Sequence, residues 1–299
     1  MLLQVLIGGV VTGLLYALVA LGFSLIYSGT RIFHLAHGAV YASAAYLFLC
    51  WSSLMGRLLP QDGWLAFGLA LVATVAAACL LAACFERVVY RPLYLKQAPP
   101  LVNFISSLGI YIVVVNLIAL FFGSQTQTLS AGGGESLTWG AVVVTQSQQT
   151  QLVVSLLALG ATFAFLRVTS LGRNIRALSD NPLLLSVLGV SPERVRLAVI
   201  LLGSALAALA SLLKAFEVGA DPAAGFQPVL IATVAMIIGG IGSSGGAVWS
   251  ALLLGVVQNA VVWFLSARWQ YAATFVVLVL VLALRREGFF TASLRVEER

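Results

Sequence analysis

Apolar runs long enough to cross a lipid bilayer follow one another along almost the whole chain. A transmembrane helix needs about 20 mostly apolar residues. Of the 299 residues, 61% are hydrophobic and only 9% are charged, whereas a soluble domain carries about 25% charged residues. The sequence therefore predicts an all-α, polytopic membrane protein with a single transmembrane domain over residues 1–299. The predicted spans lie near residues 3–27, 34–55, 64–85, 101–122, 151–168, 195–216, 246–265 and 269–284.

One further apolar segment, near residues 228–241, is too short to cross as a regular helix. The glycine-rich run 239–246 follows it directly. We interpret this region as a broken or re-entrant segment, which gives eight or nine crossings. In the first span, Gly9 and Gly13 lie four residues apart and predict close packing against another helix.

The basic residues predict the orientation. Thirteen of the 16 Lys and Arg residues fall in linkers that share one side of the membrane, or in the C-terminal tail. Because cytoplasmic loops carry an excess of Lys and Arg, we expect an external N-terminus and a cytoplasmic C-terminus. The linker 123–150 contains neither Lys nor Arg, so it is predicted to be an external loop, with strand character at 141–144. This placement of charge at span ends does not indicate nucleic-acid binding, despite the net charge of +6.

The long cytoplasmic loop 169–194 carries signals for a short helix. Asp180 and Asn181 precede Pro182, which suits the first position of a helix. The apolar run 183–188 follows, and Gly189 can end the helix in the left-handed conformation. Its leucines could fold back onto the bundle or the lipid headgroups, or they could form a contact for a cytoplasmic partner. In addition, Ser191, Pro192 and Glu193 are expected to cap the next span.

Both histidines of the chain, His34 and His37, lie between the first two spans. Two ligands are too few for a metal site, so none is expected. A proton relay is one alternative, because imidazole titrates near neutrality. The favoured alternative is that at least one histidine forms a hydrogen bond with a broken backbone. The three cysteines lie in apolar segments without CxxC spacing and are expected to be buried free thiols.

Other polar residues lie in or near the spans. Asn103, Ser107 and Asn116 in the fourth span could bind solute or form interhelical hydrogen bonds. Lys214 and Glu217, three residues apart, are predicted to form an ion pair. No nucleotide-binding loop or nucleophile–base pair is visible in the sequence, so the chain is not expected to be an enzyme or to hydrolyse ATP itself.

Several of these stretches, in order along the chain, resemble the smaller inner-membrane permease subunit of branched-chain amino-acid importers of the ATP-binding-cassette (ABC) type. They are residues 13–22 with 25–27 and 36–38, 86–93, Gly172-Arg173 with Arg176-Ala177, 188–190 with Arg194-Val195, and 239–243 with Gly246-Ala247.

The resemblance implies one half of a translocation pathway in the bacterial inner membrane. A second permease subunit, expected to be a different chain, would complete the pathway. Two cytoplasmic ATPases would bind ATP and Mg, a periplasmic solute-binding protein would deliver the solute, and the chain itself would carry no cofactor. The implied ATPase-coupling residues are Gly172, Arg173, Arg176, Asp180, Pro182, Leu184, Leu188 and Gly189. The candidates for lining the pathway are His34, His37, Gly38, Tyr41, Asn103, Ser107, Asn116, Gly240 and Gly242.

The sequence departs from the family pattern at a few positions. The family commonly has Asn where His34 stands, Gly where Ser211 stands, and Ile or Val followed by Pro where Ser244 and Gly245 stand. Importers of urea, short amides or aromatic acids in the same family are therefore the alternative to a branched-chain amino-acid importer. A stand-alone channel or secondary transporter is a second alternative, and an intramembrane enzyme is a third.

Overall fold

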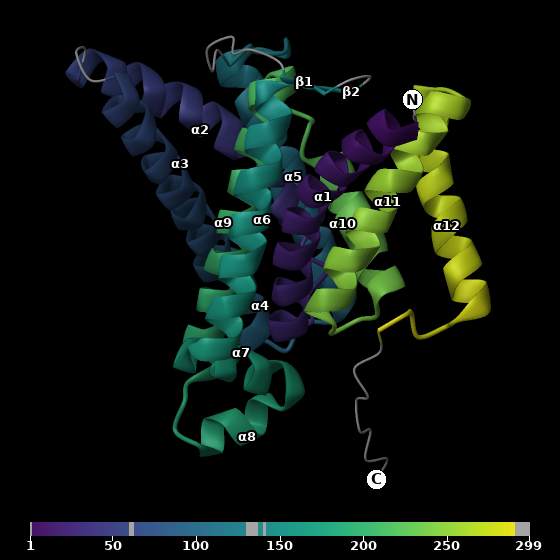
Figure 1. Ribbon diagram of the computed structural model, residues 1–299. Coiled ribbons are helices and arrows are strands. Elements are labelled where there is room, and N and C mark those ends of the chain that lie inside the picture. Colours follow the sequence, from purple (N-terminus) through teal and green to yellow (C-terminus); the bar gives the residue numbers. More distant parts are fainter. Residues whose placement is uncertain (1, 60–62, 130–136, 140–141, 291–299) are drawn as a thin grey trace.

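The computed structural model describes residues 2–59, 63–129, 137–139 and 142–290, and its architecture is a helical bundle (Figure 1). Eight helical segments are long and apolar enough to cross a membrane, which confirms the predicted fold class. The boundaries differ from the predicted spans by a few residues. The segments are α1 (Leu2–Thr30), α2 (Ala36–Leu58), α3 (Gly63–Phe85), α5 (Pro100–Phe122), α6 (Gln146–Val168), α9 (Pro192–Val218), α11 (Ser244–Phe264) and α12 (Gln270–Leu284).

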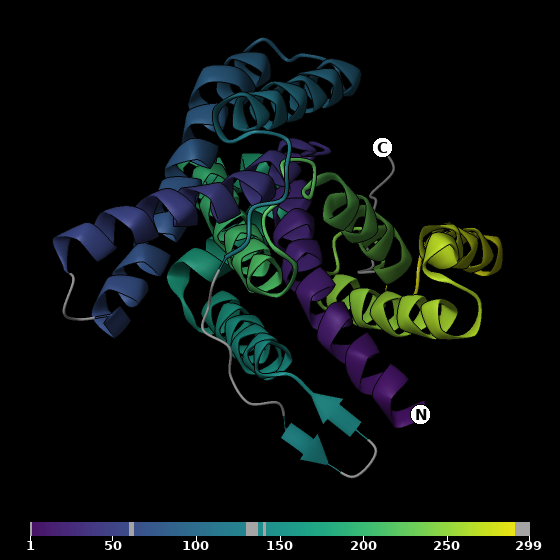
Figure 2. The same cartoon turned by 90° about the horizontal axis from the view of Figure 1, so that it is seen from above.

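Helix α1 lies at the centre of the bundle, where it packs against α9 and α11 (Figure 2). The predicted close packing at its glycines is confirmed. A Cβ atom added to Gly13 would lie 2.9 Å from the Cα of Leu252 in α11. A Cβ on Gly9 would lie 2.7 Å from the Cα of Val256. Only glycine permits this approach of two backbones, because any larger side chain would force the helices apart.

Helix α3 does not end at the membrane surface but continues through a π-helical turn, Glu86–Tyr90, into α4 (Arg91–Leu95). A π-turn inserts an extra residue into the helix and is frequent at functional sites. Here it turns Tyr90 and Glu86 into the bundle, where both side chains are buried. No periodic pattern in the sequence predicts this turn.

The glycine-rich run 239–246, where the sequence predicts the break, forms the turn into α11 and the first residues of α11. The non-helical residues instead lie at 219–225, before α10 (Phe226–Gly239). Its 14 residues rise only about 20 Å, short of the hydrocarbon thickness of about 30 Å. Among the described residues, eight segments are long enough to cross a membrane, and α10 is a shorter apolar helix. In Figure 1, the start of α1 and the end of α12 lie at opposite ends of the bundle.

The turn from α10 to α11 depends on glycine. Gly240 and Gly242 have φ values of 96° and 94°, which residues with a Cβ rarely adopt. Backbone approach is equally tight, because a Cβ on Gly239 would lie 2.2 Å from the carbonyl carbon of Gly246. The segment after α12 closes this turn: the N–H of Phe289 donates to the carbonyl of Ile238 at 2.9 Å.

At the opposite end of the bundle, β1 (Leu137–Trp139) and β2 (Val142–Val144) form an antiparallel hairpin (Figure 1). This confirms strand character for 142–144, whereas position 141 lies outside the described residues. The expectation of buried cysteines is wrong for Cys50 and Cys84, which are exposed. Both lie on outward helix faces, where a thiol can meet lipid as readily as an alanine can.

Candidate functional site

The loop 169–194 folds into two short helices at the end of the bundle farthest from the hairpin (Figure 1). The first is α7 (Ser170–Asp180), which the sequence analysis did not predict as a helix. Thr169 caps it by accepting a hydrogen bond from the N–H of Gly172 at 3.0 Å. A Cβ on Gly172 would lie 2.4 Å from the carbonyl oxygen of Leu166, so glycine is needed where the chain turns back on α6.

Two arginines fasten α7 to the end of α6. Arg173 donates to the carbonyl of Val168 at 3.2 Å, and Arg176 donates to the carbonyl of Leu166. The last carbonyls of a helix have no partner within the helix, and a cation beside them also complements the helix dipole. Arg173 and Arg176 therefore couple any displacement of α7 to α6.

The second short helix, α8 (Pro182–Val187), forms as the sequence predicts. The side-chain oxygen of Asn181 accepts from the N–H groups of Leu183 and Leu184, both at 3.0 Å. Pro182 occupies the first turn, and Gly189 ends the segment with a φ of 81°. The cap at the start of α9 differs from the prediction, since the Ser191 side chain makes no capping hydrogen bond.

Helix α8 presents its apolar side chains outward. Leu185 alone is anchored in the bundle, with 2% of its surface exposed. The other four form a continuous apolar surface, which we call the α8 patch. Its members are Leu183, Leu184, Val187 and Leu188, exposed by 78%, 57%, 81% and 69%. Folding back onto the bundle therefore applies only to Leu185, and the α8 patch is left to contact either lipid headgroups or a partner.

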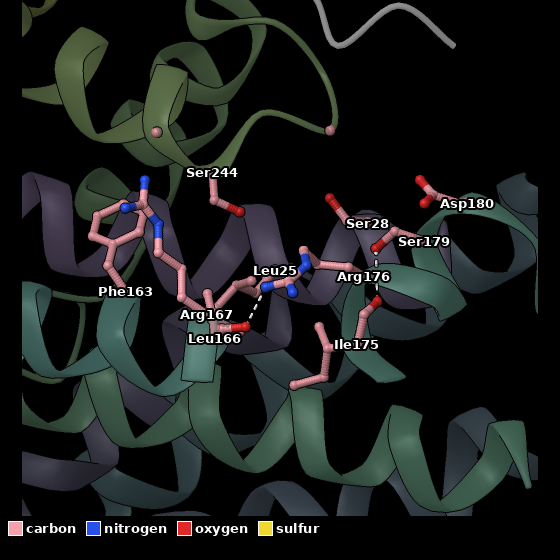
Figure 3. Close-up of a pocket in the computed structure, with 12 residues that line it drawn as sticks. Leu25, Ser28, Phe163, Leu166, Arg167, Ile175, Arg176, Ser179, Asp180 and Ser244 are labelled. Atoms are coloured by element: carbon pink, nitrogen blue, oxygen red, sulfur yellow. Dashed lines mark hydrogen bonds between the residues drawn. The ribbon is translucent and has the colours of Figure 1, made fainter. Parts of the chain in front are cut away.

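A pocket of about 400 Å³ lies between α7, α6, the end of α1 and the α10–α11 turn (Figure 3). Arg176 and Asp180 of the predicted coupling loop line it, together with Gly242 of the glycine-rich turn. Figure 3 shows Arg176 directed across the pocket floor toward Leu166, with the α10–α11 turn on the opposite side. The coupling loop and the glycine-rich turn, which the sequence analysis identified separately, therefore line the same pocket. A movement of α7 would change the shape of this pocket.

The histidines lie inside the bundle and do not line an open surface. His34 is 2% exposed and His37 is fully buried. The His34 ring lies 4.9 Å from that of Tyr90, which the π-turn positions. The ring nitrogens of His37 and Nε2 of His34 make no hydrogen bond to any described residue. In this linker the N–H of Ala36 donates to the hydroxyl of Ser107 at 2.9 Å, so a serine rather than a histidine satisfies this backbone group.

The remaining pathway candidates fall into two groups, one at each end of α10. Gly38 packs against Gly225 just before α10, and a Cβ on Gly225 would lie 1.9 Å from the carbonyl oxygen of Gly38. Tyr41 is buried and lines a cavity of about 30 Å³ beside this contact. Gly240 and Gly242 lie in the turn after α10. The structure does not bring the two groups together.

Neither asparagine makes an interhelical hydrogen bond. Asn103 donates to the carbonyl of Ala98 at 3.4 Å, and Asn116 donates to the carbonyl of Ile112 at 2.7 Å. Both bonds are local, and Asn116 is exposed on α5. The predicted ion pair is confirmed, with Lys214 Nζ 2.8 Å from a carboxylate oxygen of Glu217.

The sequence analysis missed two features of this region. The first is the burial of Tyr90 beside His34, which depends on the π-turn, and no periodic pattern in the sequence predicts that turn. Residues 219–225 could have been identified, because Asp221-Pro222 between Gly219 and Gly225 is a helix-breaking combination.

Comparisons with known proteins agree with this geometry. Residues 5–282 match the family described as "Branched-chain amino acid transport system / permease component". The high-affinity branched-chain amino acid transport system permease protein LivH of Escherichia coli K12 is 31% identical over 294 residues, covering 96% of this chain and 94% of LivH. BraD of Pseudomonas aeruginosa, a permease protein of the same kind of system, is 31% identical over 297 residues, with the same coverage.

Among solved structures, PsaBC from Streptococcus pneumoniae in complex with Fab superposes over 97% of this chain and 92% of that chain. The TM-score is 0.50 and the sequence identity is 11%, so the likeness is one of fold alone. The matched family consists of transport subunits rather than enzymes. The chain is a multi-pass membrane protein that belongs to the branched-chain amino-acid permease family of ABC importers.

Proposed function

We propose that this chain forms half of the translocation pathway for branched-chain amino acids in the bacterial inner membrane. LivH and BraD, similar over nearly their whole length, carry this substrate in their names. The main departure from the family pattern, His34, is 2% exposed and faces Tyr90 rather than an open surface. It therefore gives no reason to prefer urea, a short amide or an aromatic acid. A different permease chain completes the pathway, and a periplasmic binding protein delivers the solute.

The α8 patch is the contact for a cytoplasmic ATPase, and this is the observation that carries the proposal. Four large apolar side chains are exposed there, at the end of the bundle. Exposed apolar patches of this kind mark protein contacts. ATP and Mg bind to the two ATPase subunits, and this chain supplies the surface against which they push.

A displacement of α8 reaches the transmembrane helices through identified contacts. Asn181 joins α7 to α8 and caps α8. Arg173 and Arg176 join α7 to the end of α6, and the pocket between α7 and the α10–α11 turn changes shape as α7 moves. ATP binding then favours one arrangement of the helices over another, because the ATPases bind the two arrangements with different affinity.

The same proposal fixes the orientation. The end of the bundle that carries α7, α8 and the segment after α12 faces the cytoplasm, and the end with the N-terminus and the hairpin faces the periplasm. The concentration of Lys and Arg in the linkers of the first end supports this assignment.

Replacement of Leu184 and Leu188 by Asp tests the docking contact. We expect ATPase co-purification and ATP-dependent leucine uptake to be lost, while the permease still accumulates in the membrane. The matched control is Leu95→Asp on α4, a leucine exposed by 63% outside the α8 patch. Undiminished co-purification and uptake in the double variant would contradict the proposal.

A further inference from the structure

Non-helical backbone joins α9 to α10 at residues 219–225, and within it Ala220 forms an antiparallel bridge with Gln127 of the loop after α5. The hydroxyl of Tyr111 donates to the carbonyl of Ala223 at 3.3 Å, and the Tyr111 ring lies 5.6 Å from that of Phe226. Tyr111 is the middle residue of the 23-residue helix α5. Independently, α10 reaches only about 20 Å inward from its turn at Gly240. Both relations place Ala223 and Phe226 far from either membrane surface.

Part of this break is exposed on the single chain. Ala223 and Ala224 are exposed, as are Gln227 and Phe226 (39%) at the start of α10, whereas Ala220, Pro222 and Gly225 are buried. Irregular backbone within a membrane is tolerated only where it is buried in protein or lines a water-filled cavity, because lipid cannot satisfy its polar groups.

The charge at the break is negative. Asp221 is partly exposed, and one carboxylate oxygen accepts from the N–H of Ala223 at 2.8 Å. The nearest cation along the chain, Lys214, is already paired with Glu217 at 2.8 Å. Among the described residues, no Lys or Arg forms an ion pair with Asp221. The second oxygen of Asp221 can therefore accept hydrogen bonds from a cationic group.

We propose that residues 221–227 form the solute-contacting wall of the translocation pathway, with Asp221 as the contact for the solute's ammonium group. The inference rests on the proposed function, since an amino acid is the solute that brings an ammonium group. It replaces the histidines as the polar centre of the pathway. The second permease faces the break across water rather than sealing it.

Cysteine accessibility tests the wall without depending on transport. Cys50, Cys79 and Cys84 are replaced by Ala, and Ala224→Cys is introduced in membrane vesicles from cells that make the whole transporter. A small, positively charged thiol reagent is supplied on both faces. We expect labelling about tenfold faster than at Ala161→Cys, an exposed alanine inside α6, because thiol modification requires the thiolate and hence water. Gln227→Cys serves if Ala224→Cys does not accumulate.

Asp221→Asn tests the ammonium contact, because Asn keeps the oxygen that accepts from Ala223 and removes only the charge. We expect leucine uptake to fall about tenfold, the effect of losing a charge-assisted hydrogen bond, with ATPase co-purification unchanged. Unlabelled Ala224→Cys and Gln227→Cys, or full uptake by Asp221→Asn, would overturn the inference. Leucine uptake by the unmodified transporter in the same vesicles tests the proposed function separately. Uptake can be normal even if positions 224 and 227 are not reached by water, and in that case only the further inference fails.

Discussion

His34 lies in the linker between α1 and α2, and its burial decides its protonation. Loss of contact with water, and secondarily the neighbouring His37, lower the pKa of His34 from 6.5 to about 3. Between these two pKa values the unfolded chain binds more protons than the folded one. The stability that comes with neutral His34 is therefore complete above about pH 6.5 and is lost as the pH falls toward 3.

We expect His34→Asn to reduce the acid sensitivity of the fold. Between pH 7.5 and 5.0, the wild-type protein should lose about 2 kcal/mol more folding free energy than the variant. Thermal unfolding of the purified protein in detergent at the two pH values measures the difference. Equal shifts in melting temperature for the two proteins would show that His34 is not the group that takes up the proton.

Gly225 packs against the backbone of Gly38, and this close contact between the break and α2 can be tested by substitution. In Gly225→Ala the new methyl group would lie 1.9 Å from the Gly38 carbonyl oxygen. We expect a loss of about 1–3 kcal/mol in stability from the forced backbone shift, and reduced transport because α2 and α10 separate. Gly109→Ala on α5 is the control, since its Cβ would meet no atom within 4 Å. Equal melting temperatures for both variants would contradict the expectation.

At the scale of elements, α8 is a helix of only six residues whose stability depends on its ends. Asn181→Ala removes the acceptor for two N–H groups, so we expect α8 to lose about 1 kcal/mol of local stability. A frayed α8 presents the α8 patch less well, and ATPase co-purification should fall. Ser191→Ala is the matched control, because Ser191 occupies the corresponding position of α9 without a capping hydrogen bond. If both variants retain the ATPases equally, the cap does not contribute to docking.

At the scale of the whole molecule, the start of α1 and the end of α12 lie at opposite ends of the bundle. With the proposed orientation, a green fluorescent protein fused to the C-terminus should fluoresce, because it folds in the cytoplasm. A cysteine introduced at Gln4 should react with an impermeant reagent added to spheroplasts. If alkaline phosphatase fused to the C-terminus were active instead, the C-terminus would lie in the periplasm. The proposed orientation would then be wrong, and the α8 patch would lie outside the cytoplasm.

The spans could be predicted from the sequence because their apolar runs approach or exceed the roughly 20 residues that a bilayer demands, and because a chain with 9% charged residues does not suit a soluble fold. Helix α8 could be predicted for a similar reason, since Asn181, Pro182 and Gly189 are local signals that act within one turn. The pathway candidates were less accurate. His34 and His37 were chosen for their chemistry, but burial against Tyr90 and Phe23 removes them from any open surface.

The sequence by itself determined that this chain lives in a membrane, where its helices lie and where a short apolar helix leaves the bundle. These features follow from hydropathy and capping, which act over neighbouring residues. Only the tertiary structure decided that Ala223 and Ala224 of the segment 219–225 are exposed while the histidines are buried. Exposure depends on which helices pack together, and contacts such as Gly38 with Gly225 join residues that are distant along the chain.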